Sequence, residues 1–180
     1  MAASVLIAGI GNVFHGDDAF GVAVIHKLAA ATFPESLSVK LMDIGIRSID
    51  LGFALLNDYD LTILIDATAR GRAPGTLYTI EIRPRDIPDA CGGAIMNSHS
   101  LDLVRVLALA KNMGAGFKRI FLIGCEPLVL NHDESGHIGL SEAVEAAVDT
   151  AIETILRLVR EFADSGTMTT EQEVYSHECV

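Results

Sequence analysis

Tryptophan is absent from this sequence of 180 residues, and cysteine occurs only three times. Cys91, Cys125 and Cys179 cannot all pair within the chain, and their spacing matches neither a CxxC motif nor a zinc knuckle. This cysteine usage predicts a reducing, cytoplasmic location. Basic residues are also scarce, since 13 Lys and Arg oppose 24 Asp and Glu and give a net charge of −11. Nucleic-acid binding requires a clustered basic surface, so we expect a protein or small-molecule partner and no nucleic acid.

Long apolar runs are missing as well, although half of the residues are hydrophobic. None of the apolar segments approaches the roughly 20 uninterrupted residues that a membrane-spanning helix needs, so we expect no membrane insertion. The first four residues contain no basic stretch or cleavage site, which argues against an export signal. Length and composition predict one domain over residues 1–163, followed by a disordered acidic tail, 164–180, that contains no Lys or Arg.

Strand-like and helix-like segments alternate along the chain, which is the pattern of a sheet covered by helices on both faces. We therefore predict an α/β fold, a three-layer α/β/α sandwich with a mostly parallel, twisted sheet of about five strands. The expected strands are 5–10, 39–43, 61–66, 75–82 and 120–124, and the expected helices are 18–31, 49–57, 100–113 and 141–162. Segment 61–66 is nearly all apolar, as expected of a central strand, whereas 75–82 is expected nearer an edge.

Local signals refine the helix ends and the loops. Ser48 is well placed to cap the second helix, and Asp17 can cap the first by accepting from its free amides. Phe20, Val24, Ile25 and Leu28 share one face of the first helix and predict its buried stripe. Residues 83–97 include two prolines and two glycines and predict a long loop, a kind of segment that is often functional.

Candidate ligands follow the ends of the predicted strands, where open α/β sheets bind their ligands. Asp18 follows the first strand, Asp66 ends the third, and His99 stands at the end of the long loop. An ionised group at the end of an apolar strand is costly unless it is paired, hydrogen-bonded or metal-bound. Two carboxylates and an imidazole suit nickel, zinc or iron. On the residues alone, Asp18 can equally be a helix cap, and His99 a cap or a surface residue.

Other motifs lead to weaker hypotheses. A dinucleotide fingerprint would need glycine where the chain has Phe14, so the glycines at 9 and 11 indicate a tight turn instead. Segment 132–137 has histidines at both ends, but its polar, glycine-containing sequence is typical of a solvated surface. His15 lies inside the first loop and is a candidate for supporting the ligands. Cys91 has no catalytic pattern around it, so thiol or serine hydrolase chemistry has little support.

Four ordered segments resemble the hydrogenase maturation endopeptidases: Gly9-Ile10-Gly11-Asn12, Gly16-Asp17-Asp18-Ala19-Phe20-Gly21, Leu64-Ile65-Asp66-Ala67 and Ser98-His99-Ser100-Leu101. The resemblance covers about residues 4–160 and includes Gly124-Cys125-Glu126-Pro127 and Gly139-Leu140-Ser141. It implies an α/β/α fold and a nickel-contacting, catalytic trio, Asp18, Asp66 and His99. It also implies removal of a C-terminal peptide from a nickel-loaded hydrogenase large-subunit precursor, with the nickel supplied by the substrate rather than permanently bound.

The sequence departs from this family at two places. Ala19 stands where glycine is common, and segment 43–47 (Asp-Ile-Gly-Ile-Arg) replaces the more usual Asp-Gly-Gly-Thr loop. Asp43, Gly45 and Arg47 are predicted substrate-binding residues, although Asp43 can equally be a turn residue and Arg47 a surface charge. Two alternative functions stay open, a protein that docks on a metallocentre assembly complex without cutting it and a small-molecule α/β hydrolase, the latter suggested by fold alone.

Overall fold

The computed structural model describes residues 2–89, 103–129 and 138–165. Within these ranges, five strands form one sheet in the order β2-β1-β3-β5-β4. The strands are β1 (Ala3–Ile10), β2 (Leu37–Gly45), β3 (Leu61–Ala67), β4 (Leu77–Ile82) and β5 (Ile120–Cys125). All pairings are parallel except that of β4 with β5. The predicted strands are therefore confirmed, with β3 at the centre and β4 at an edge, and so is the mostly parallel sheet.

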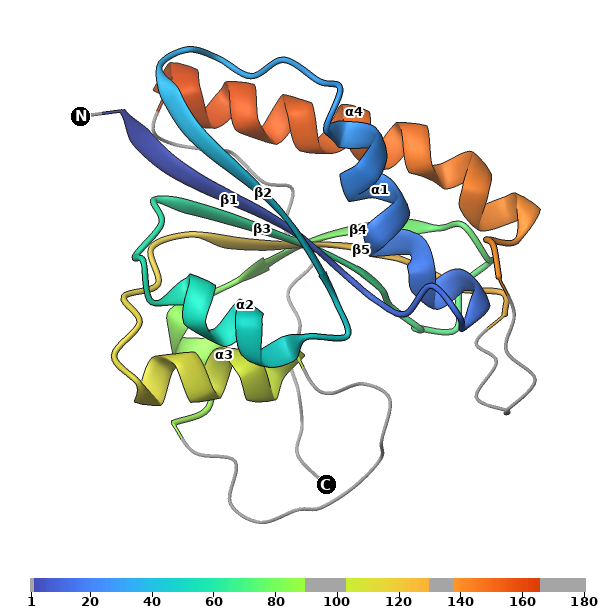
Figure 1. Cartoon of the computed structure of the whole chain (residues 1–180), viewed down its shortest axis with the longest axis horizontal. Coiled ribbons are helices and arrows are strands. Elements are labelled where there is room, and N and C mark those ends of the chain that lie inside the picture. The colour runs from blue at the N-terminus through green and yellow to red at the C-terminus, as the bar shows by residue number, and fades with distance from the viewer. Residues whose placement is uncertain (1, 90–102, 130–137, 166–180) are drawn as a thin grey trace.

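Helices cover both faces of the sheet and complete the predicted three layers (Figure 1). Helices α1 (Phe20–Leu28) and α4 (Glu142–Ser165) lie on one face, and α2 (Ser48–Leu55) and α3 (Leu103–Asn112) lie on the other. Alternate residues of β1 contribute to two separate cores: Val5 and Ile7 pack towards α1 and α4, while Leu6 and Ala8 pack towards α2 and α3. This period of two explains why β1 reads as a continuous apolar run.

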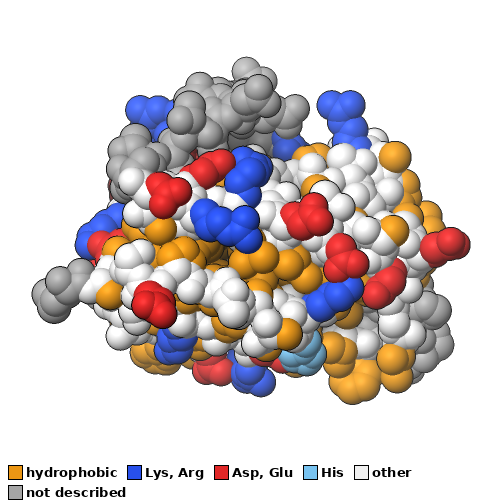
Figure 2. Space-filling model, turned by 90° about the horizontal axis from the view of Figure 1, so that it is seen from above, with side chains coloured by type: hydrophobic (Ala, Val, Ile, Leu, Met, Phe, Trp, Pro, Cys, Tyr) orange, Lys and Arg blue, Asp and Glu red, His pale blue; other side chains and the backbone are white. Residues whose placement is uncertain are grey.

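The outer surface of α1 and α4 carries charged as well as apolar side chains, unlike the two apolar cores. Figure 2 shows acidic and basic side chains interspersed on that face, with apolar side chains between them. None of the helices in the described ranges is long and apolar enough to cross a membrane.

Helix ends differ from the sequence prediction in several places. The first helix begins at Phe20, not residue 18, because a short 3-10 turn, η1 (Gly16–Ala19), precedes it, and it ends at Leu28. Its predicted apolar stripe is confirmed, since all four members are buried. Ser48 is the first residue of α2 rather than its cap, and the cap position is held by Arg47, which makes no capping hydrogen bond. That prediction was wrong because the chain enters α2 one residue earlier than the pattern indicated.

The long loop and the C-terminal segment are described only in part. The beginning of the predicted loop 83–97 contains a short 3-10 turn, η2 (Pro84–Asp86). Helix α4 continues to Ser165, three residues beyond its predicted end at residue 162, and the predicted domain bounds and acidic tail stay predictions. Residues 90–102, 130–137 and 166–180 lie outside the described ranges, and so do Cys91, Cys179 and most of the predicted tail.

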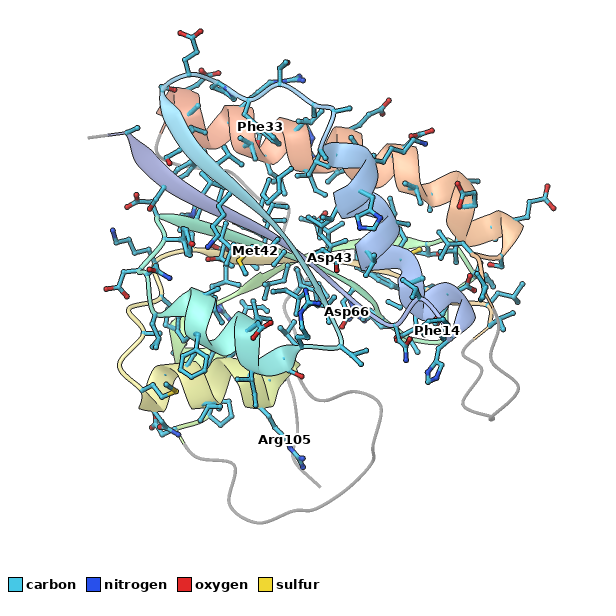
Figure 3. All side chains as sticks on the ribbon, in the orientation of Figure 1. Phe14, Phe33, Met42, Asp43, Asp66 and Arg105 are labelled. Carbon is cyan, nitrogen blue, oxygen red and sulfur yellow. The ribbon has the colours of Figure 1, made fainter. Side chains whose placement is uncertain are left out.

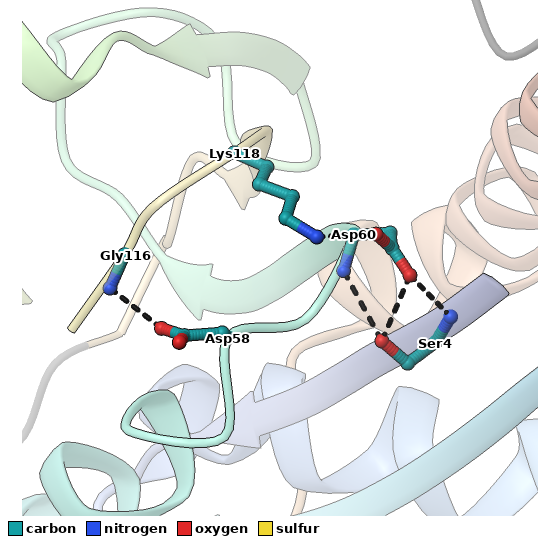
Figure 4. Close-up of polar contacts among 5 residues, drawn as sticks. All are labelled: Ser4, Asp58, Asp60, Gly116 and Lys118. Carbon is teal, nitrogen blue, oxygen red and sulfur yellow. Dashed lines mark hydrogen bonds and ion pairs between the residues drawn. The ribbon is translucent and has the colours of Figure 1, made fainter.

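Asp60 ties together the amino ends of β1 and β3, at the edge of the sheet where these strands begin (Figure 4). Its Oδ2 accepts from the amide of Ser4 at 2.8 Å and from the hydroxyl of Ser4 at 3.0 Å. Lys118 Nζ donates to Oδ1 at 2.6 Å. The Lys118 ammonium and the Ser4 amide lower the pKa of Asp60 from 3.8 to about 2. Nearby, Asp58 accepts from the amide of Gly116, so this edge is held by side chains rather than by the ladder alone.

We predict that Asp60→Asn destabilises the protein by about 1 kcal/mol near neutral pH, a small effect because solvent screens the partly exposed ion pair. A carboxyl whose folded pKa is about 2 contributes stability that is present above pH 3.8 and is lost as the pH falls through 2. Urea unfolding of both proteins should therefore show a difference at neutral pH that shrinks under strongly acidic conditions. A difference that stays constant over this pH range would contradict the assignment.

Candidate active site

The strand order reverses direction at β1. The chain passes from β1 to its neighbour β2 and later returns to β3 on the other side of β1. Open α/β sheets bind ligands beyond the carboxyl ends of their strands at such a switch point. Gly9 of β1 pairs with Ile65 of β3, so the next residue, Asp66, lies at this shared edge. Figure 3 labels Asp66, Asp43 near the end of β2 and, farther along the same end of the sheet, Phe14 in the loop after β1.

Two glycines allow the turn that carries Asp18 to approach the sheet. A Cβ at Gly11 would overlap the carbonyl oxygen of Asp18, and a Cβ at Gly21 would overlap the carbonyl oxygens of Ile10 and Ile65. Gly11 also has φ +136°, which side-chain-bearing residues rarely adopt. A Cβ at Gly9 would likewise overlap the carbonyl oxygen of Gly21, so the glycines at 9 and 11 allow η1 and the start of α1 to lie directly against β1.

Asp18 and Asp66 form a pair of interacting carboxyl groups at this edge. The amide of Asn12 donates to Oδ2 of Asp18 at 2.8 Å and fixes that carboxylate beside the end of β1. Burial, together with the negative charge of Asp18, raises the pKa of Asp66 from 3.8 to about 7. Two like charges that interact in this way are mutually unfavourable, and a cation placed between them removes the repulsion. The pair therefore has the chemistry of a site for a metal ion with oxygen ligands.

The third predicted ligand, His99, lies outside the described residues, as does the rival segment 132–137. Within the described ranges, no three His, Cys, Asp or Glu side chains are grouped so that they could hold a metal ion. The structure thus brings together two members of the predicted trio, Asp18 and Asp66, and the imidazole stays a prediction. His15 is part of the turn that carries Asp18, because its carbonyl oxygen accepts from the Asp18 amide at 3.4 Å.

The loop after β2 adjoins the turn that carries Asp18, because the amide of Gly11 donates to the carbonyl oxygen of Gly45 at 3.1 Å. Gly45 has φ +54°, so glycine is favoured at this bend. The side chains of Asp43 and Arg47 have partners within the protein: Asp43 Oδ2 lies 2.9 Å from His26 Nε2, and Arg47 Nη2 donates to the carbonyl oxygen of Asp43 at 2.6 Å. The predicted contacts of these three residues with substrate stay predictions.

Asp17 differs from its neighbour because it is completely buried. The prediction that Asp17 caps α1 was wrong, since that helix has no side-chain cap. Its carboxylate accepts from the amides of Leu128 and Val129, both at 2.8 Å, and from the amide and hydroxyl of Ser141 at 2.6 and 2.9 Å. Burial opposes ionisation, but these hydrogen bonds outweigh it and lower the pKa of Asp17. Asp17 therefore anchors the segment after β5 and the start of α4 to the loop that carries Asp18.

Glu126 has the same role for the segment after Asp66. This buried carboxylate follows β5 and accepts from the amides of Arg70 and Gly71 at 2.8 and 3.0 Å and from the hydroxyl of Tyr78 at 2.5 Å. Burial opposes ionisation, but the hydroxyl and amide donors lower the pKa of Glu126. Burial and the bond to Glu126 raise the pKa of Tyr78 to about 12. The guanidinium of Arg70 lies 4.8 Å from the centre of the Tyr78 ring and adds a cation–π contact.

A family model described as hydrogenase maturation protease matches residues 22–158, which include Asp66 and begin shortly after Asp18. A hydrogenase expression/formation protein, HupD from Rhodobacter capsulatus, is 36% identical over 156 residues, which are 87% of this chain and 71% of that protein. The chain belongs to the hydrogenase maturation protease family. The family resemblance seen in the sequence is therefore confirmed, and the enzyme class is that of a peptidase.

Other members of the hydrogenase maturation protease family agree with this assignment. The hydrogenase 2 maturation protease of Escherichia coli is 29% identical over 157 residues, covering 87% of this chain and 91% of its own length. The solved structure of the hydrogenase maturating endopeptidase HybD from E. coli has a TM-score of 0.72 and 28% identity, covering 88% and 93% of the two chains. The [NiFe] hydrogenase maturation protease HycI from Thermococcus kodakarensis has a TM-score of 0.64 and 26% identity over the same shares.

Alanine at Asp17 and alanine at Asp18 should lower the free energy of unfolding by different amounts. Asp17→Ala leaves the amides of Leu128, Val129 and Ser141 without their buried acceptor, so we predict that it lowers the free energy of unfolding by about 3 kcal/mol. Asp18→Ala loses the hydrogen bond from the Asn12 amide but also removes the repulsion of Asp66, so it should cost less stability than Asp17→Ala. Thermal unfolding of both variants tests this directly. Equal losses, or a larger loss for Asp18→Ala, would contradict the anchoring role of Asp17.

Proposed function

We propose that this chain removes a C-terminal peptide from the nickel-loaded precursor of a hydrogenase large subunit. The observation that carries the proposal is the pair of coupled carboxyl groups, Asp18 and Asp66, at the switch point of the sheet, where a cation relieves their repulsion. Family membership supports peptide-bond hydrolysis as the reaction. The names of relatives, such as the hydrogenase 2 maturation protease of E. coli, support a hydrogenase precursor as the partner.

Nickel enters this proposal as part of the substrate. Asp18 and Asp66 supply oxygen ligands, and we assign His99 as the third ligand, as the resemblance implies. Such an oxygen and nitrogen donor set suits a divalent nickel ion and leaves positions for the ligands that the precursor itself provides. The set contains no thiolate of the kind that secures structural ions. Binding of the precursor's own nickel would therefore both recognise a loaded precursor and bring its scissile peptide bond to the end of the sheet.

A water molecule is the attacking nucleophile in the proposed reaction. One route uses nickel as a Lewis acid that polarises the peptide carbonyl. The other uses nickel for positioning while a carboxylate removes the proton from water. A pKa of about 7 for Asp66 is close to the operating pH that favours a general base. Nearby nickel favours the ionised form of Asp66, which is the form that a general base needs. In this proposal Asp66 therefore serves both as a nickel ligand and as the base. The loop with Asp43, Gly45 and Arg47 is proposed to contact the polypeptide next to the nickel.

Mass spectrometry of a cognate precursor tests the proposal. The wild-type protein should release a C-terminal peptide from the nickel-loaded precursor and leave the nickel-free precursor intact. Alanine substitution of Asp18, Asp66 or His99 should lower the rate at least about a hundredfold, because each removes a group that positions the reacting bond. Asp149→Ala is the matched control, since this exposed aspartate on α4 pairs only with Lys27 among the described residues and should leave processing unchanged.

Two results would contradict the proposal. Full processing by Asp18→Ala would show that the reaction does not need the carboxylate pair. Binding of a verified cognate precursor without any cleavage would favour the alternative function, a protein that docks on a metallocentre assembly complex without cutting it.

A further inference from the structure

Four large apolar side chains are exposed around the candidate site. The exposed fractions are 43% for Val13, 61% for Phe14, 73% for Ile46 and 60% for Leu128. Isolated apolar side chains on a protein surface are ordinary and need no explanation. These four come from three separate loops that follow β1, β2 and β5 at the same edge of the sheet, and grouped apolar exposure of this kind marks an interaction surface.

Hydrogen bonds connect two of these loops to the aspartates of the site. The amide of Phe14 donates to Oδ1 of Asn12 at 3.0 Å, and the amide of Asn12 donates to Oδ2 of Asp18 at 2.8 Å. The amide of Leu128 donates to Oδ2 of Asp17, also at 2.8 Å. Both apolar side chains therefore stand on backbone that is fixed relative to Asp18.

The third loop is connected in the same way. Ile46 directly follows Gly45, whose carbonyl oxygen accepts from the amide of Gly11 at 3.1 Å. Gly11 in turn packs against the backbone of Asp18. The three loops that carry the four side chains are therefore linked, by hydrogen bonds or close packing, to segment 11–18, which carries Asp18.

We infer that Val13, Phe14, Ile46 and Leu128 form an apolar collar that binds an apolar surface of the hydrogenase large-subunit precursor beside its nickel. The inference rests on the proposed function. If a metal ion carried by a folded protein must reach Asp18 and Asp66, the protein surface around that ion must come into contact with the residues that border them. The occupant is thus a polypeptide surface with apolar side chains next to the metal.

The charges around the collar favour this apolar occupant. Residues 11–16 and 126–129 contain no Lys or Arg. Arg47, beside Ile46, is engaged by the backbone of Asp43 and by the carboxylate of Asp50. The chain as a whole carries a net charge of −11. The described residues of these loops therefore supply no unpaired basic side chain to attract an acidic partner, and we expect burial of apolar surface to contribute more to docking than attraction between opposite charges.

A second exposed apolar surface supplies matched controls. Phe53 near the end of α2 is 58% exposed, and Met113 just after α3 is 46% exposed. Helices α2 and α3 each lead into a strand, so their ends lie at the edge where β3 and β5 begin, opposite the candidate site. Serine at these positions removes similar apolar surface without touching the collar.

The experiment compares Phe14→Ser/Ile46→Ser with Phe53→Ser/Met113→Ser in cleavage of the nickel-loaded precursor. The collar variant should raise KM at least about tenfold, the expected effect of losing two buried apolar contacts. Its kcat should be unchanged, because the lost contacts serve ground state and transition state alike. The control variant should have the kcat and KM of the wild-type protein. Raising the salt concentration should change the wild-type KM only slightly.

Each outcome separates the two claims. If the wild-type protein does not cleave the precursor, the proposed function fails. If the wild-type protein cleaves it and the collar variant has the KM of the control variant, the collar is wrong while the proposed function stands. A wild-type KM that rises steeply with salt would overturn the apolar character of the interface.

Discussion

The close approach of α1 to β1 and β3 is the constraint on which the candidate site depends. Gly11 and Gly21 leave room for backbone oxygens where any side chain would overlap them. That approach brings Asp18 from the loop after β1 close enough to Asp66 for their charges to interact and for the pKa of Asp66 to rise to about 7. An arrangement that is unfavourable in the free protein becomes favourable when a cation lies between the two carboxyl groups.

Two other buried carboxylates stabilise the loops around this unfavourable pair. Asp17 accepts hydrogen bonds from the segment after β5 and from Ser141 at the start of α4. Glu126 accepts from the backbone of the segment that follows Asp66 and from Tyr78. Both are ionised and fully supplied with donors, so their burial is compensated, unlike that of Asp66. The described loops around Asp18 and Asp66 are thereby held by hydrogen bonds to buried carboxylates, which favours the positioning of a metal and a peptide bond.

Much of this arrangement could be predicted from the sequence because it depends on short-range patterns. Alternation of apolar strands and helices gave the three layers, and strand ends indicated Asp18 and Asp66. The anchoring role of Asp17 could not be predicted, since its partner Ser141 is 124 residues away and a local helix cap explained the same residue. For Glu126, only the family resemblance drew attention to the segment, and no local pattern reveals donors at Arg70 and Tyr78. Ser48 was misjudged because helix boundaries depend on the preceding turn, here set by Gly45.

Direct ligation of the substrate's nickel by Asp18 and Asp66 is the central claim, and X-ray absorption at the nickel edge tests it most directly. Spectra are recorded for the nickel-loaded precursor alone and for its mixture with the protein, frozen before turnover is complete. The account predicts additional oxygen ligands on nickel in the mixture and their loss with Asp18→Ala/Asp66→Ala. An unchanged nickel environment in a mixture that is shown to contain the complex would contradict it.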